Sequence, residues 1–192
     1  MINAAHTAAI LLAAGQSVRF GADDKLLADL DGKPLALHAA HRLVDLAPGS
    51  LIAVCRDADS ALARDLVALG FVIVANPDSA RGLSHSLACG IAQAARGSAQ
   101  AALICLADMP FVSTAHIQTL LDRFEENTSP VVASSDGHAA MPPAIFARSL
   151  FDRLQSTKGD RGGRGLLAGA LLVPASPDEL ADIDQPQDLR GV

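Results

Sequence analysis

A series of short apolar runs constrains the fold of this 192-residue sequence more than any other feature. Each run is four to six residues long and almost wholly apolar, rather than alternating between apolar and polar positions. Such runs are typical of parallel strands that are covered by helices on both faces. Strands are therefore predicted over Ala9–Ala13, Leu51–Cys55, Phe71–Ala75, Ala101–Leu106, Pro130–Ser134 and Ala170–Val173.

The stretches between these runs carry apolar residues at helical spacing, as in the stripe of Leu62, Leu66 and Leu69. Repeated strand–helix–strand units of this length predict an α/β fold, a doubly wound and mostly parallel sheet with helices on both faces. Ligands bind such Rossmann-like folds at the loops that leave the carboxyl ends of the strands. Helices are predicted over Leu35–Leu46, Ala58–Leu69, Ser84–Ala95 and Thr114–Phe124.

Length and composition favour one domain that spans residues 1–192. Half of the residues are hydrophobic, which is enough to bury a sizeable core, although only 3% are aromatic. After Pro143 the pattern loosens, and Gly159–Gly169 is rich in Gly and Arg. We expect this second half to supply the remaining strands and long functional loops of the same domain.

The charge and the apolar pattern exclude several classes of partner. The net charge of −6 comes without a basic run, so neither nucleic acid nor an anionic membrane is expected as a partner. No apolar stretch is long enough to span a bilayer, and no Lys or Arg precedes the first apolar run, so neither a membrane span nor a signal peptide is expected. Three cysteines at long spacings are expected to be free thiols, which suits a cytoplasmic protein.

The loop after the first predicted strand is the first candidate binding site. It contains Gly15 and Gly21 with Arg19 between them, and Lys25 follows. Glycines allow backbone N–H groups to approach a polyphosphate, and the two cations can neutralise it. The spacing of the glycines fits neither the dinucleotide-binding motif nor the P-loop.

The whole segment Leu12-Ala13-Ala14-Gly15-x-Ser17-x-Arg19-Phe20-Gly21-x-x-x-Lys25 resembles the signature of the nucleotidyltransferases that make molybdenum-cofactor dinucleotides. It is similar, more loosely, to enzymes that make nucleotide sugars and CDP-alcohols. Further segments match that family in the same order. They are Asn76-Pro77, Gly82-Leu83-Ser84-x-Ser86-Leu87, Asp108-Met109-Pro110, Gly159-Asp160-x-Gly162-x-Arg164 and Asp182-Ile183-Asp184-x-Pro186-x-Asp188-Leu189.

The resemblance implies a role for each matching position. It implies that Arg19, Lys25 and Asp108 are catalytic and that Asp108 and Asp184 bind Mg²⁺, a metal that prefers oxygen ligands. It places the acceptor at Asp160 and Arg164. It also implies a nucleotide-binding set that consists of Leu12, Ala13, Ala14, Gly15, Asn76, Gly82, Ser84 and Ser86. His85, beside this set, is expected to be a hydrogen-bonded residue at a helix start.

The implied reaction transfers a nucleotide monophosphate from an NTP to a phosphorylated small-molecule acceptor and releases pyrophosphate. CTP is the favoured donor, because guanylyl relatives carry Gly at the position of Ala14, and molybdopterin is the implied acceptor. Two alternatives stay open: an enzyme of the same fold with a different base or acceptor, and a non-catalytic carrier of the finished cofactor. A molybdoenzyme or its chaperone is a possible transient partner.

Overall fold

The computed structural model describes residues 2–15, 20, 24–156 and 162–190. Its main element is one seven-stranded sheet in the order β5-β4-β1-β6-β8-β7-β9. A separate pair of two-residue strands, β2 (Asp29–Leu30) and β3 (Lys33–Pro34), forms a hairpin. The strands of the main sheet are β1 (Thr7–Ala13), β4 (Ser50–Cys55), β5 (Val72–Ala75), β6 (Ala101–Leu106), β7 (Val131–Ser135), β8 (Ala140–Ala147) and β9 (Leu171–Pro174).

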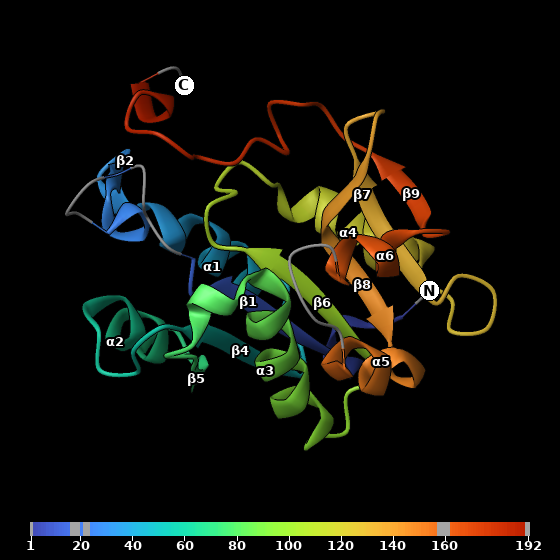
Figure 1. Cartoon of the computed structure of the whole chain (residues 1–192). Coiled ribbons are helices and arrows are strands. Elements are labelled where there is room, and N and C mark those ends of the chain that lie inside the picture. The colour runs from blue at the N-terminus through green and yellow to red at the C-terminus, as the bar shows by residue number, and fades with distance from the viewer. Residues whose placement is uncertain (1, 16–19, 21–23, 157–161, 191–192) are drawn as a thin grey trace.

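Helices cover both faces of the sheet (Figure 1). Helices α1, α2 and α4 contribute to the apolar core on one face, and α3, α5 and α6 contribute to the core on the other. The α-helices are α1 (Leu35–Asp45), α2 (Ala61–Ala68), α3 (Leu83–Ala95), α4 (Thr114–Arg123), α5 (Phe151–Ser156) and α6 (Gly162–Leu167). Short 3₁₀ turns occur at Ala4–His6, Lys25–Leu27, Ser79–Arg81, Arg148–Leu150 and Asp188–Arg190.

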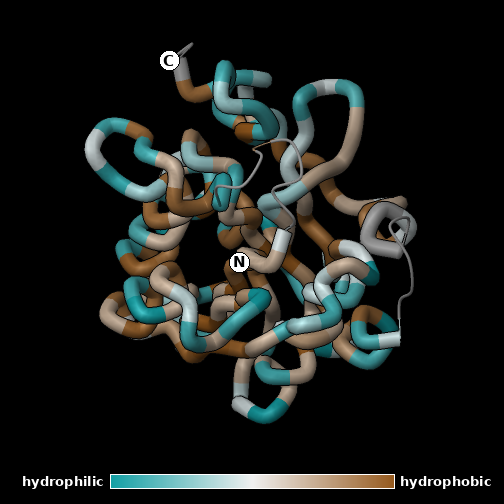
Figure 2. Tube along the Cα trace, turned by 60° about the vertical axis from the view of Figure 1, so that its left-hand side comes forward, coloured by the Kyte–Doolittle hydropathy of each residue, from teal (hydrophilic) through white to brown (hydrophobic). Residues whose placement is uncertain are grey.

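The strand β1 lies near the middle of the sheet and pairs in parallel with β4 on one side and β6 on the other. Every residue of β1 is buried, which explains why its apolar run is continuous. Alternate residues along β1 serve the two cores: Leu11 packs with α1, and Ile10 packs with α3. Figure 2 shows apolar stretches gathered inside the molecule and hydrophilic residues in the outer loops.

Helix α3 packs closely against the sheet beside the edge where the predicted site lies. A Cβ atom added at Gly90 would come within 2.7 Å of Ile10 Cγ2 and 3.1 Å of Val54 Cγ2. Real Cβ atoms do not approach other side chains that closely, so this crossing requires glycine. The close packing brings the first turn of α3 beside the carboxyl end of β1.

The predicted α/β fold is confirmed: a mostly parallel seven-stranded sheet carries helices on both faces. All six predicted strands and all four predicted helices are present within a few residues of the expected bounds. Helix α2 begins at Ala61 rather than Ala58, because the Ser60 side chain accepts a hydrogen bond from Ala63 N and caps the helix there. The single-domain organisation over residues 1–192 stays a prediction.

The strand β8 is not among the strands predicted from the apolar runs, and it is antiparallel to both of its neighbours. It contains Pro142 and Pro143, and prolines argue against an internal strand because they cannot donate to the ladder. The structure accommodates them where the register with β7 shifts, between the pairs Ala133↔Ala144 and Ser134↔Met141. Pairing with β6 starts only at Ala144, so neither proline has to donate.

None of the helices in the described part of the chain is both long and apolar enough to cross a membrane. The described cysteines Cys55, Cys89 and Cys105 are free, as expected. Cys55 and Cys105 are buried, whereas Cys89 is only half-buried.

Candidate functional site

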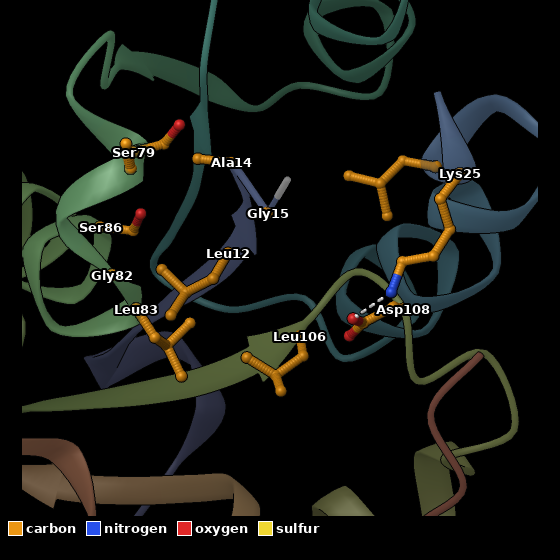
Figure 3. Close-up of a pocket in the computed structure, with 12 residues that line it drawn as sticks. Leu12, Ala14, Gly15, Lys25, Ser79, Gly82, Leu83, Ser86, Leu106 and Asp108 are labelled. Carbon is orange, nitrogen blue, oxygen red and sulfur yellow. Dashed lines mark hydrogen bonds and ion pairs between the residues drawn. The ribbon is translucent and has the colours of Figure 1, made fainter. Parts of the chain in front are cut away.

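A cavity of about 270 Å³ opens at the carboxyl end of β1, between the first turn of α3 and the loop after β6. Figure 3 shows Ser79, Gly82, Leu83 and Ser86 along one side of it and Lys25 with Asp108 on the opposite side. We call it the small cavity. Its lining consists of Leu12, Ala14, Gly15, Lys25, Leu26, Ser79, Ala80, Gly82, Leu83, Ser86, Leu106 and Asp108.

The first turn of α3 gives this cavity a partial positive charge. The helix starts at Leu83, and the residue before it, Gly82, has a φ of 95°, which side chains rarely allow. Backbone N–H groups of a first helical turn have no partner within the helix, and the helix dipole adds to their effect. This end of the small cavity can therefore bind the oxygens of an anionic ligand.

Three residues far apart in the sequence meet on the opposite side of the small cavity. Lys25 Nζ lies 2.9 Å from Asp108 Oδ2 and 3.2 Å from Asp184 Oδ1. The Lys25 side chain is only 10% exposed, whereas those of Asp108 and Asp184 are 26% and 45% exposed. Burial lowers the pKa of Lys25, but the ion pairs with both carboxylates outweigh it, so the pKa is raised. The lysine is therefore a permanent cation at neutral pH.

Backbone contacts hold the two carboxylates independently of the lysine. Ile183 N donates to the backbone oxygen of Asp108 at 2.9 Å, which fixes the loop after β9 beside the end of β6. The Asp188 carboxylate accepts from Asp184 N at 2.9 Å and from Gln185 N at 2.7 Å. Asp184 therefore lies on a loop that is shaped by its own hydrogen bonds.

A third carboxylate, Asp182, lies close to this group and was not predicted as a site residue. Partial burial raises its pKa, and the negative charges of Asp184 and Asp108 raise it further. Asp182 and Asp184 flank the buried Ile183. In an extended segment, residues two apart point to the same side, so this alternation could have revealed Asp182 from the sequence. Among the described residues, three carboxylates therefore lie close to Lys25, and carboxylate oxygens are the ligands that Mg²⁺ prefers.

A second, larger cavity of about 930 Å³ adjoins the small one, because Leu12, Leu83 and Leu106 line both. We call it the large cavity. Its wall is mainly apolar and comes from β6, β8, α3, α6 and the loop after β9. Besides those three leucines it is lined by Ser84, Leu87, Ile104, Met109, Asp136, Ala139, Ala140, Met141, Pro142, Ala144, Phe146, Leu167, Ala168, Pro177, Leu180 and Asp182.

The structure places most of the predicted nucleotide-binding residues around the small cavity. Leu12, Ala14, Gly15, Gly82 and Ser86 line it. The other three predicted members lie elsewhere. Ser84 lines the large cavity, and the side chain of Ala13 packs in the core on the α1 face. Asn76 is 1% exposed and lies behind Ser86, which it contacts.

Some predicted residues lie outside the described part of the chain. These are Arg19 of the first loop and Asp160 of the predicted acceptor site. Arg164 lies in α6, but its side chain is not described. Their catalytic and acceptor-binding roles stay predictions.

The donor chemistry of the site fits a magnesium ion. In the described residues, no three His, Cys, Asp or Glu side chains are arranged to hold a metal. Mg²⁺ does not need such a cage, because it usually binds one or two carboxylates together with water and substrate phosphates. Asp108 and Asp184 already share one cationic partner and supply the carboxylates for such a site.

Known proteins resemble this chain over more than half of its length or nearly all of it. A model of the MobA-like NTP transferase domain matches residues 9–177. A probable molybdenum cofactor guanylyltransferase of Haloferax mediterranei is 27% identical and covers 96% of this chain and 92% of its own. The purine catabolism protein PucB of Bacillus subtilis is 34% identical over 117 residues, and this chain spans only 56% of its length.

Solved structures show the same fold. The crystal structure of Rv0371c from Mycobacterium tuberculosis superposes with a TM-score of 0.81 and 22% identity, and it covers 96% of this chain and 95% of its own. Molybdopterin-guanine dinucleotide biosynthesis protein A from Archaeoglobus fulgidus gives a TM-score of 0.65 with 18% identity, at 95% of both chains. Since the family model spans most of the chain, we conclude that the protein is a nucleotidyltransferase of the MobA-like NTP transferase domain family.

Proposed function

We propose that the protein transfers CMP from CTP to a phosphorylated acceptor, molybdopterin, and releases pyrophosphate in a Mg²⁺-dependent reaction. The observation that carries this proposal is the group of Lys25, Asp108 and Asp184 at the edge of the small cavity. The large cavity begins next to it. A donor in one cavity and an acceptor in the other would meet beside these charges.

The chemistry is an in-line attack of an acceptor phosphate oxygen on the α-phosphorus of the nucleotide, with pyrophosphate as the leaving group. The protein has to position the two substrates and neutralise the charge that develops, which is typically the largest catalytic effect. Lys25 and Arg19 would hold the β- and γ-phosphates and stabilise the leaving pyrophosphate. A Mg²⁺ ion on Asp108 and Asp184 would supply further charge neutralisation at the phosphates.

The acceptor proposal rests on the large cavity. Its mainly apolar wall suits the flat ring system of a pterin better than a sugar, whose hydroxyl groups would each need a polar partner. Two carboxylates, Asp136 and Asp182, stand in this wall and can accept hydrogen bonds from ring N–H groups. The Haloferax relative is named for molybdenum cofactor, which supports the same substrate class.

The choice of CTP rests on Ala14. Its methyl group is buried and lines the small cavity, where it narrows the space for a base. GTP is the second candidate, because several relatives are named molybdenum cofactor guanylyltransferases. A purine would have to fit beside Ala14 in a cavity of about 270 Å³, which is slightly below the roughly 300–1,000 Å³ of small-molecule sites.

A cytoplasmic enzyme of this kind would pass its product to a molybdoenzyme or a chaperone, which is the transient partner we propose. The alternative of a non-catalytic carrier is less well supported. A carrier of the finished cofactor has no need for a lysine and two carboxylates at the junction of two cavities.

The test is pyrophosphate release by the purified protein with CTP or GTP, each with and without molybdopterin, in the presence and absence of Mg²⁺. We expect release that requires CTP, acceptor and metal together. Equal or faster release with GTP would replace the cytidylyl proposal by the guanylyl one. Tight binding of molybdopterin cytosine dinucleotide with no release under any condition would favour the carrier.

A further inference from the structure

A chain of four side chains runs behind the small cavity and ends on one of its lining residues. Arg81 Nη1 lies 3.1 Å from His85 Nε2, and His85 Nδ1 lies 2.8 Å from Asn76 Oδ1. Asn76 Nδ2 donates to Ser86 Oγ at 2.9 Å. Asn76 and Ser86 are 1% and 4% exposed, so the inner half of this chain is shielded from water.

The arginine determines the direction of every hydrogen bond in this chain. A guanidinium has only donors, so His85 Nε2 must accept from Arg81. A neutral imidazole has one donor and one acceptor, so the proton lies on Nδ1, which donates to Asn76 Oδ1. With its oxygen committed to His85, Asn76 can only present its NH₂ group to Ser86.

Ser86 therefore meets the small cavity with a defined polarity. Its oxygen accepts from Asn76, and no acceptor among the described residues takes its hydroxyl hydrogen. Ser86 lines the small cavity on the same side as Gly82 and Leu83 (Figure 3). The hydroxyl group is therefore set to donate its hydrogen to a ligand in that cavity.

We propose that Arg81, His85 and Asn76 are positioning residues that make Ser86 a hydrogen-bond donor to N3 of the cytosine base, and that this polarity selects cytosine over uracil. The inference rests on the proposed pyrimidine nucleotide donor and adds the group that reads the base. Cytosine has an unprotonated N3, which accepts, whereas uracil carries N3–H, which donates. Two donors facing each other leave a buried polar group unpaired, which is strongly discriminating.

The comparison of CTP with UTP separates this mechanism from base size. Both pyrimidines have the same ring, so the methyl group of Ala14 affects them alike. Only the hydrogen-bonding pattern of the base edge differs between them. A preference between the two nucleotides therefore reports on Ser86 and on the residues that orient it.

The decisive variant is Asn76→Asp, which keeps the shape of the side chain and removes its donor. A carboxylate at this position accepts from His85 and also from Ser86, which turns the hydroxyl hydrogen away from the cavity. Ser86 then faces the base with lone pairs, which suit N3–H of uracil. We expect the ratio of CTP to UTP affinity, measured by calorimetry with Mg²⁺, to fall at least about tenfold, in the range for a misplaced hydrogen bond.

The double variant Asn76→Asp with Ser86→Ala is the control for a purely structural effect. If Asn76 acts through the Ser86 hydroxyl, the aspartate changes the CTP to UTP ratio in the parent protein but not in the Ser86→Ala background. Equal losses of both nucleotides in both backgrounds would overturn the proposal. Arg81→Leu should give a smaller shift in the same direction, and Arg64→Leu, on the exposed face of α2, should give none.

A measurement without nucleotide separates this proposal from the proposed function. Long-range ¹H–¹⁵N NMR at about pH 8.5, well above the ordinary histidine range, reports the tautomer of His85. We expect the proton on Nδ1 in the parent protein and a mixture of tautomers in Arg81→Leu. A proton on Nε2 of His85 in the parent protein would overturn the proposed chain of hydrogen bonds even if CTP is the substrate. Failure of both CTP binding and CTP turnover with the Nδ1 tautomer intact would overturn the cytosine contact together with the proposed function, and only the hydrogen-bond directions would stand.

Discussion

The two cavities that share Leu12, Leu83 and Leu106 differ in kind. The small cavity has a helix N-terminus on one side and the Lys25–Asp108 ion pair on the other, so its walls carry charge of both signs. The large cavity is more than three times as big and is mainly apolar, and its described wall contains Asp136 and Asp182 but no lysine or arginine.

This difference indicates two modes of recognition in one site. A triphosphate is a chemically uniform ligand, and fixed charges and backbone N–H groups can bind it in any member of such a family. An acceptor is recognised through shape and a few hydrogen bonds, because apolar contact alone discriminates weakly. Substitutions of the charged residues beside the small cavity should therefore affect turnover with every nucleotide, whereas those on the large-cavity side should affect the acceptor alone.

The largest effect is expected from Asp108→Ala and Asp184→Ala. Either change removes a proposed metal ligand and should lower turnover at least about a hundredfold, since charge neutralisation at the phosphates is worth several kcal/mol. Mn²⁺ binding followed by electron paramagnetic resonance should weaken in parallel. Asp65→Ala, at an exposed position of α2, serves as the control and should leave both measurements unchanged. Near-normal Mg²⁺-dependent turnover in either site variant would show that the metal ligands are wrong.

The same comparison shows what the sequence could reveal. The small cavity is built from loops that follow continuous apolar strands, so Ala14, Gly15 and Asp108 could be placed at one sheet edge from the pattern alone. The ion pair between Lys25 and Asp184 spans most of the chain. No periodic pattern in the sequence predicts a contact between residues this far apart. Only the resemblance to a family pointed to both residues as parts of one site.

The large cavity could not be predicted, because its wall depends on β8. That strand crosses the sheet in the antiparallel direction with two adjacent prolines, and a local pattern argues against any strand there. The apolar residues Met141 and Leu167 come from β8 and α6 and meet only after the chain folds. Helix α6 is short and contains glycines, so helical spacing does not reveal it either.

Filling the large cavity should separate the two substrates. Ala168→Phe places a ring into this cavity from the end of α6, where Ala168 is exposed to it. We expect the KM for the acceptor to rise roughly tenfold, in line with the 1–3 kcal/mol cost of overpacking, while the affinity for CTP stays the same. Ala68→Phe adds the same ring at an exposed position of α2 and should change neither value. A parallel loss of CTP affinity would mean that the two cavities do not act separately.

A change of one methyl group should alter base choice on the small-cavity side. Ala14→Gly widens the space beside the base and should relax the preference for CTP over GTP by about 1–3 kcal/mol without reversing it. Ala13→Gly removes the same methyl group one residue earlier, where it packs in the opposite core, and is the matched control. The measurement is kcat/KM with each nucleotide. An equal change in both variants would indicate a general weakening of β1 rather than a change in the cavity.

The smallest effect is expected from Asp182→Asn, which tests the carboxylate of the large cavity that lies near Asp108 and Asp184. Burial and the nearby Asp184 and Asp108 raise the pKa of Asp182 above its ordinary value of 3.8, so the folded protein binds this proton more tightly than the unfolded chain does. Stability is therefore lost as the pH rises from 3.8 through the raised pKa of the folded state, and the carboxylate is a net cost at neutral pH. Removing the charge should stabilise the fold at pH 7 by less than about 1 kcal/mol, because the side chain is exposed to solvent, and should raise the melting temperature slightly. The gain should shrink as the pH falls through 3.8, because below that value Asp182 is protonated in both states. A lower melting temperature for Asp182→Asn at pH 7 would mean that Lys25 outweighs the two carboxylates at this position.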